Sequence, residues 1–270
     1  MPTLFKFALL GVLAVLASGL GACSSNKIIK YDTPLNNLKN EPRENKQDKR
    51  REDAQIHLQL GAALMNRGDL KGADQEFRKG IAADPDYPTA HTMLAILDEH
   101  VNLPREAEQE YRRALAIDPK NGDANNNLGY FLCHHGKEKE AMGYFQRALA
   151  DPFYSTPAKA NANAGACLAR SGDYKGAEEY LRKALRIDSS DPIALYEMAH
   201  VMYAQSDAFH ARAFLQRFEA QGQATPDSLL LGYQIESRLG DADAARNYAN
   251  RLRSQFPESD QAQQLSGTPQ

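Results

Sequence analysis

The side chains of this chain that are best suited to covalent chemistry are its three cysteines. Cys23 ends an apolar N-terminal run, whereas Cys133 and Cys167 lie in the middle of the chain. A thiol can be acylated, bind a metal ion or form a disulfide. If Cys23 is acylated, the other two form an even pair, which is a disulfide candidate in an oxidising compartment. The alternative is that both are free, buried thiols.

Other chemistry is weakly represented. His134 and His135 directly follow Cys133 and could suggest a metal site, but adjacent residues of a helix point in different directions. The sequence has no Gly-rich phosphate loop, no Gly-x-Ser-x-Gly motif and no His-Glu-x-x-His motif. We therefore predict a protein that is not an enzyme and that needs no metal or other cofactor.

The N-terminus has the pattern of a secretory signal peptide. Lys6 precedes an apolar run over residues 7–20, which is shorter than the roughly 20 residues of a transmembrane helix. Residues 20–23, Leu-Gly-Ala-Cys, are similar to the bacterial lipobox, which implies cleavage before Cys23 and lipidation of its thiol. Ser24 rather than aspartate follows, which by the bacterial sorting rule implies an outer-membrane location. The alternative is an ordinary signal peptide with a chance cysteine.

Composition and charge define the remaining organisation. The net charge is −3 and 25% of residues are charged, so the chain has no basic field for nucleic acid. We expect a signal peptide over residues 1–22, a lipidated N-terminus and polar tether over 23–53, a repeat region over 54–258 and a flexible tail over 259–270. The charged end of the tether is expected to be a solvated linker, with a basic membrane-surface patch as the alternative.

The elements that must position Cys133 and Cys167 come from a repeat of about 34 residues. A small residue is followed twelve positions later by an alanine and four positions after that by a bulky residue. This pattern is typical of tetratricopeptide repeats (TPRs) and predicts an all-α superhelix of six helix-turn-helix repeats. The three sets are Gly61, Ala95, Gly129, Gly165, Ala199 and Gly232; Ala73, Ala107, Ala141, Ala177, Ala211 and Ala244; and Phe77, Tyr111, Phe145, Leu181, Leu215 and Tyr248.

This repeat frame places the two cysteines on the first helices of repeats three and four. First helices of neighbouring repeats stack side by side, so the Cα atoms can approach to the roughly 5.5–6 Å that a disulfide needs. Residues 151–157 lengthen the connection between these two repeats, either as a tolerated insertion or as a bend or contact point.

The same frame predicts a protein-binding groove. In TPR arrays the first helices line the concave face, and here they offer an apolar surface with a few amides. Such a surface suits an amphipathic helix or an extended apolar segment. A clamp for a C-terminal carboxylate is excluded, because Leu58 and Ala62 replace the lysine and asparagine that it needs. The predicted groove residues are Leu58, Ala62, Met65, Thr92, Ile96, Asn126 and Tyr130.

Three segments carry a more specific resemblance. Residues 127–133 (Asn-Leu-Gly-Tyr-Phe-Leu-Cys), 148–157 (Ala-Leu-Ala-Asp-Pro-Phe-Tyr-Ser-Thr-Pro) and 163–167 (Asn-Ala-Gly-Ala-Cys) resemble the PilF/PilW family of type IV pilus biogenesis lipoproteins. The resemblance covers most of the chain. It implies a pilotin that binds secretin subunits and promotes their outer-membrane localisation and multimerisation, with outer-membrane lipid as a second partner through acylated Cys23. The alternative is a general periplasmic TPR scaffold for envelope assembly.

Overall fold

The computed structural model describes residues 45–222 and 224–266. The predicted signal peptide, Cys23 and most of the predicted tether lie outside the described residues. The helices are α1 (Lys46–Asn66), α2 (Leu70–Ala83), α3 (Pro88–His100), α4 (Pro104–Ile117), α5 (Gly122–His134), α6 (Glu138–Ala150), α7 (Pro157–Arg170), α8 (Tyr174–Ile187), α9 (Pro192–Ala204), α10 (Ala208–Glu219), α11 (Pro226–Leu239), α12 (Ala242–Gln255) and α13 (Asp260–Ser266).

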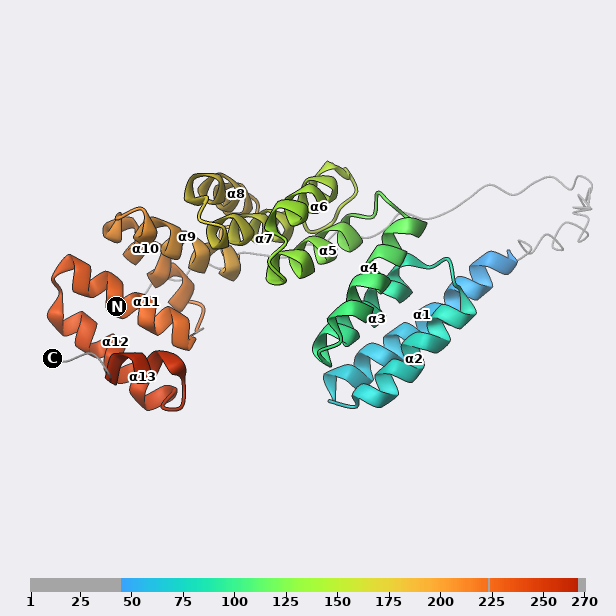
Figure 1. Ribbon diagram of the computed structural model, residues 1–270, viewed down its shortest axis with the longest axis horizontal. Coiled ribbons are helices and arrows are strands. Elements are labelled where there is room, and N and C mark those ends of the chain that lie inside the picture. The colour runs from blue at the N-terminus through green and yellow to red at the C-terminus, as the bar shows by residue number, and fades with distance from the viewer. Residues whose placement is uncertain (1–44, 223, 267–270) are drawn as a thin grey trace, which may run out of the picture. The chain divides into compact units, whose positions relative to one another are not determined.

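Successive helices pack as pairs, from α1 with α2 to α11 with α12, and each pair forms one helix-turn-helix repeat (Figure 1). The first helices of neighbouring pairs also contact each other, as α5 and α7 do. The predicted all-α architecture of six repeats is therefore confirmed. Among the described residues, no helix is both long enough and apolar enough to cross a membrane.

The small residues of the repeat allow the two helices of a pair to approach closely. A Cβ atom added to Gly61 would lie 2.5 Å from the ring of Phe77, and one added to Gly129 would lie 2.9 Å from the ring of Phe145. Any side chain at these positions would therefore displace a fully buried aromatic ring. The spacing recognised in the sequence is thus the spacing of an interhelical contact.

A glycine and a capping aspartate form the turn inside the first repeat. Gly68 has a φ of 81°, in the left-handed region that glycine favours, and it follows the end of α1. The Asp69 carboxylate then accepts a hydrogen bond of 2.9 Å from the backbone N–H of Gly72, which caps α2. The same chemistry explains why Gly-Asp pairs recur between the helices of a repeat.

The sixth repeat departs from the predicted spacing. Here Gly240 is itself the C-cap of α11, with a φ of 78°, so α12 begins later relative to Gly232 than in the other repeats. The alanine that is buried is consequently Ala245, at 5% exposure, whereas the predicted Ala244 is only partly buried. Tyr248 still packs on Gly232 as expected.

The helical region extends beyond both predicted boundaries of the repeats. α1 begins at Lys46, before the boundary placed at residue 54, because the charged run contains good helix formers and the Asn45 side chain accepts from the Gln47 N–H. Part of the predicted tail forms α13, whose Ala262 and Leu265 are 4% and 8% exposed. These two residues are three positions apart, so they share the helix face that packs on α11 and α12.

The longer connection at residues 151–157 contains two aromatic residues with opposite surroundings. Tyr154 is buried against Gly122, where an added Cβ would lie 2.6 Å from the Tyr154 ring. Phe153 is 92% exposed. The connection is therefore held to the start of α5 by one aromatic ring, while it presents the other to solvent.

Candidate protein-binding groove

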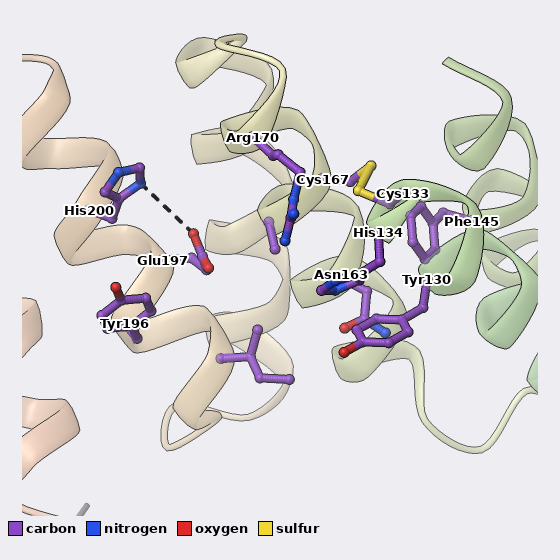
Figure 2. Close-up of a pocket in the computed structure, with 12 residues that line it drawn as sticks. Tyr130, Cys133, His134, Phe145, Asn163, Cys167, Arg170, Tyr196, Glu197 and His200 are labelled. Atoms are coloured by element: carbon purple, nitrogen blue, oxygen red, sulfur yellow. Dashed lines mark ion pairs between the residues drawn. A yellow bond between two sulfur atoms is a disulfide. The ribbon is translucent and has the colours of Figure 1, made fainter. Parts of the chain in front are cut away.

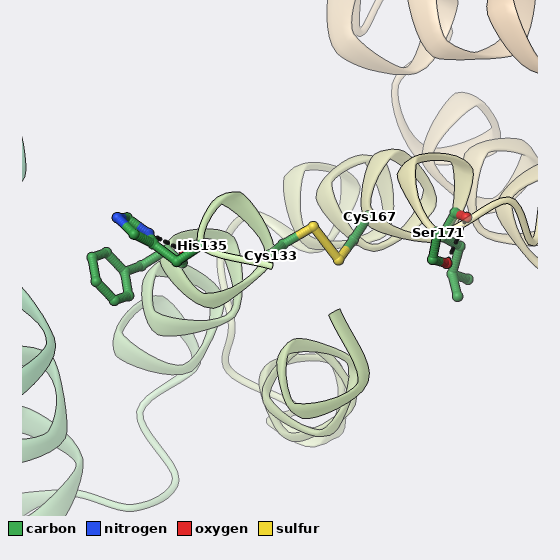
Figure 3. The surroundings of a disulfide bond; sticks show 6 residues. Cys133, His135, Cys167 and Ser171 are labelled. Atoms are coloured by element: carbon green, nitrogen blue, oxygen red, sulfur yellow. Dashed lines mark hydrogen bonds between the residues drawn. A yellow bond between two sulfur atoms is a disulfide. The ribbon is translucent and has the colours of Figure 1, made fainter. Parts of the chain in front are cut away.

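A disulfide joins the first helices of repeats three and four. Cys133 of α5 and Cys167 of α7 are bonded, with their Cα atoms 5.8 Å apart (Figure 3). Both residues are buried, at 4% and 1% exposure. The bridge closes a loop of 34 residues and fixes the distance between two helices that line the groove described next.

The two histidines after Cys133 have separate surroundings. His135 Nδ1 lies 2.8 Å from the backbone oxygen of Phe131, and its ring stacks on Phe131 with centroids 4.1 Å apart. The ring of His134 instead packs on Tyr130, with centroids 4.2 Å apart. Within the described ranges, no group of three or more metal-ligating side chains gathers here or elsewhere.

Two adjacent hollows form a groove along the first helices of the repeats. The N-terminal hollow has a volume of about 510 Å³ and is lined from α1, α3, α4, α5, α7 and α9. The C-terminal hollow has a volume of about 400 Å³ and is lined from α5, α6, α7 and α9, beside the disulfide (Figure 2). Tyr130, Asn163 and Ile193 line both hollows, so the two are continuous.

Four of the predicted groove residues meet in the N-terminal hollow. Met65 of α1, Ile96 of α3, and Asn126 and Tyr130 of α5 all line it. Tyr130 is 43% exposed, so its ring is available to a binding partner. These side chains come from three successive repeats, which is the arrangement that the repeat frame predicted.

Leu58 does not line the groove, contrary to the prediction from the sequence. It is 6% exposed and belongs to the core between α1 and α2, where an added Cβ on Gly80 would lie 3.0 Å from its side chain. The reason is helical periodicity: Ala54, Leu58 and Gly61 are spaced by four and three residues, so they share the face of α1 that packs on α2.

Two further predicted groove residues do not line either hollow. Thr92 is 7% exposed, and its hydroxyl donates a hydrogen bond of 3.1 Å to the backbone oxygen of Pro88 within α3. Ala62 is partly buried on α1. Met65 is therefore the only predicted residue of α1 that lines the groove.

The asparagines at the start of α5 divide into structural and groove-lining residues. The Asn121 side chain caps α5 by accepting from the Ala124 N–H at 2.9 Å, and Asn125 donates to the backbone oxygen of Pro119 at 3.0 Å. Asn126 instead accepts a hydrogen bond of 3.0 Å from Asn163 of α7. Two buried amides thus link repeats three and four on the floor of the groove.

The C-terminal hollow contains groove residues that the sequence analysis missed. Tyr196, Glu197 and His200 of α9 line it together with Arg170 of α7. The signal was available, because Tyr196 and His200 occupy the positions in the fifth repeat that Asn126 and Tyr130 occupy in the third. Extending the same frame by two repeats would have identified them.

Burial controls the protonation of the groove's titratable side chains. It raises the pKa of Glu197 to about 7, against the opposing effect of Arg170, and it lowers the pKa values of His134 and His200. At the other end of the groove, burial raises the pKa of Glu99, which accepts a hydrogen bond from the Tyr111 hydroxyl. The groove therefore combines aromatic and apolar walls with poorly hydrated carboxyl groups.

Comparison with known proteins agrees with the repeat frame. Family models described as tetratricopeptide repeat match residues 54–97, 110–142 and 158–191. The crystal structure of PilW, a widely conserved type IV pilus biogenesis factor, superimposes with a TM-score of 0.74 at 32% identity, covering 79% of this chain and 98% of that one. The structure of Pseudomonas aeruginosa PilF gives a TM-score of 0.73 at 30% identity, covering 81% of this chain and 98% of that one.

A curated relative gives the same result at the level of sequence. The type IV pilus assembly protein PilF of Pseudomonas aeruginosa is 31% identical over 215 residues, which are 79% of this chain and 85% of that protein. The resemblance noted in the three sequence segments is therefore confirmed over most of the chain. This chain belongs to the PilF/PilW family of type IV pilus biogenesis proteins, which are TPR scaffolds rather than enzymes.

Proposed function

We propose that this protein is an outer-membrane pilotin that binds secretin subunits and promotes their localisation and multimerisation during type IV pilus biogenesis. The observation that carries the proposal is the continuous groove along the first helices, in a chain of the PilF/PilW family. Lipid attached to Cys23 anchors the protein to the outer membrane with the repeats in the periplasm. The lipobox-like residues 20–23 support this anchor.

The groove suits an apolar protein segment. Met65, Ile96 and Tyr130 line its N-terminal hollow from three successive repeats, so they can bury one face of an amphipathic helix or of an extended strand. The disulfide and the bond between Asn126 and Asn163 hold α5 against α7, so little of this surface needs to be ordered on binding. A secretin segment held there is kept from premature contacts until subunits multimerise.

The test follows the detergent-resistant secretin multimer in cells that carry the wild-type protein, no protein, Cys23→Ala or Ile96→Arg. We expect multimers to be lost without the protein and to be mislocalised with Cys23→Ala. Ile96→Arg places a charge in the N-terminal hollow and is expected to weaken secretin binding at least tenfold, equivalent to about 1.4 kcal/mol of binding free energy, and so to reduce multimers.

The matched control is Ile187→Arg, which makes the same chemical change at a 55% exposed site at the end of α8, outside both hollows. It is expected to behave as wild type. Equal multimer levels in all of these strains would reject the pilotin function and favour a general periplasmic scaffold for envelope assembly. Equal defects for Ile96→Arg and Ile187→Arg would reject the groove as the binding site.

A further inference from the structure

The C-terminal hollow holds a carboxyl group and a guanidinium group that do not pair with each other. Glu197 of α9 and Arg170 of α7 project toward the same gap (Figure 2). The Glu197 carboxylate lies 4.0 Å from His200 Nδ1, the contact drawn as a dashed line in Figure 2, and burial disfavours the charged form of that histidine. Among the described residues, no lysine or arginine forms an ion pair with Glu197. This hollow therefore contains a carboxyl group and a guanidinium group that are both available to a ligand.

The Glu197 carboxylate and the Arg170 guanidinium differ in how much of their hydration they retain. The Glu197 side chain is 22% exposed, so its carboxylate has given up most of its hydration. Arg170 lies at the exposed end of α7 and keeps its hydration. A cation that pairs with Glu197 replaces the hydration that the carboxylate has lost. An anion that pairs with Arg170 must instead compete with water.

The walls of the hollow also favour a cation. Tyr196 and His200 of α9 and Tyr130 and His134 of α5 present aromatic rings to it. Burial lowers the pKa values of both histidines, which disfavours their charged forms and weakens any repulsion of a cation. Aromatic faces around a carboxylate attract ammonium and guanidinium groups. The charged group that opposes a cation here is Arg170.

We propose that the hollow formed by α5, α7 and α9 binds a lysine or arginine side chain of the partner protein, with Glu197 as its ion-pair partner. The inference rests on the proposed function, because it assumes that the groove binds a protein segment, and it adds the charge of that segment. The apolar residues of the segment would occupy the N-terminal hollow and its basic residue the C-terminal hollow.

The test uses small probes, so that it does not depend on the secretin. Chemical shifts of backbone amides of the ¹⁵N-labelled protein with its native disulfide are followed during titration with N-acetyl-arginine amide. The probe N-acetyl-citrulline amide has nearly the same shape without the charge, and N-acetyl-aspartate amide carries the opposite charge. We expect shifts in α7 and α9, with the arginine probe binding about tenfold more tightly than the citrulline probe.

Two substitutions with opposite expected signs identify the ion-pair partner. Glu197→Gln should bring the arginine probe to the affinity of the citrulline probe. Arg170→Gln should tighten the arginine probe about threefold, because it removes the competing cation. Lowering the pH from 8 to 6 protonates Glu197 and should weaken the arginine probe in the wild-type protein, but not in Glu197→Gln.

Equal binding of the arginine and citrulline probes would overturn the proposal. Tighter binding of the aspartate probe, lost in Arg170→Gln, would also overturn it and would assign an acidic partner group instead. Either failure leaves the multimer experiment intact, since that experiment reports on the N-terminal hollow. Conversely, unchanged multimers with a positive probe result would retain the cation site and reject the secretin as its partner.

Discussion

The two ends of the repeat array differ in how far their apolar side chains are covered. At the C-terminal end, α13 covers the last repeat with Ala262 and Leu265, which are 4% and 8% exposed. At the N-terminal end, Ile56 and Leu60 of α1 are 57% and 47% exposed. Repeat arrays need terminal caps with a polar outer face, and among the described residues only the C-terminal end has a capping helix.

The exposed residues of α1 are those of an interface between repeats. One and two repeats later, the position of Leu60 is taken by Leu94 and Leu128, which are 1% and 0% exposed because the preceding repeat covers them. Burial in such an array therefore depends on the neighbouring repeat rather than on residue type. Equivalent leucines are therefore buried inside the array but exposed on its first described helix.

The largest expected contrast is between equivalent leucines inside the array and at its end. Leu128→Ala should lower the free energy of unfolding by about 2–5 kcal/mol, since it leaves a cavity in a fully buried interface. Leu60→Ala should change it by less than about 0.5 kcal/mol, as at ordinary surface sites. Urea unfolding followed by circular dichroism measures both. A comparable loss for Leu60→Ala would show that its face of α1 is covered in solution.

A second prediction is that the disulfide stabilises the middle of the array more than either end. Reducing the disulfide between Cys133 and Cys167 should destabilise the protein by about 3–4 kcal/mol, the loop-entropy estimate for a loop of 34 residues. Amide hydrogen exchange should accelerate mainly in α5 and α7. The paired Cys133→Ala and Cys167→Ala variant should behave like the reduced protein. Equal acceleration in α1 and α12 would mean that the array unfolds as a single unit.

The smallest expected effect concerns the C-terminal cap. Leu265→Ser should destabilise the last repeat by about 1–3 kcal/mol, because it removes one of the two apolar side chains that hold α13 on α11 and α12. Hydrogen exchange in α12 is the readout, and Gln263→Ser on the exposed face of α13 is the control. If α12 exchanges equally in both variants, α13 does not function as a cap.

The sequence predicts the repeats well because their spacing records a direct contact. A Cβ atom added to Gly61 or Gly129 would clash with the ring of Phe77 or Phe145, so the small residue and the bulky residue must keep their spacing. A helical residue near the edge of a face is harder to place. The sequence predicts Leu58 in the groove, but Leu58 lies on the face of α1 that packs on α2.

The remaining differences come from packing that no local pattern determines. Residues 260–266 are mostly polar, so α13 depends on two apolar contacts with the last repeat rather than on helix propensity. In the sixth repeat, the later end of α11 moves the buried alanine to Ala245. The C-terminal hollow depends on Glu197 being enclosed by three helices, and burial of that kind follows from tertiary structure alone.

The pattern of contacts between helices determines the order in which this chain can fold. In the described part, each helix packs only on helices one or two places along the sequence. Low contact order of this kind favours fast folding, and a chain that enters an oxidising compartment N-terminus first can complete each repeat as the next one emerges. Cys167 thus meets Cys133 on a repeat that has already formed, which directs oxidation to the native pair without a search among distant partners.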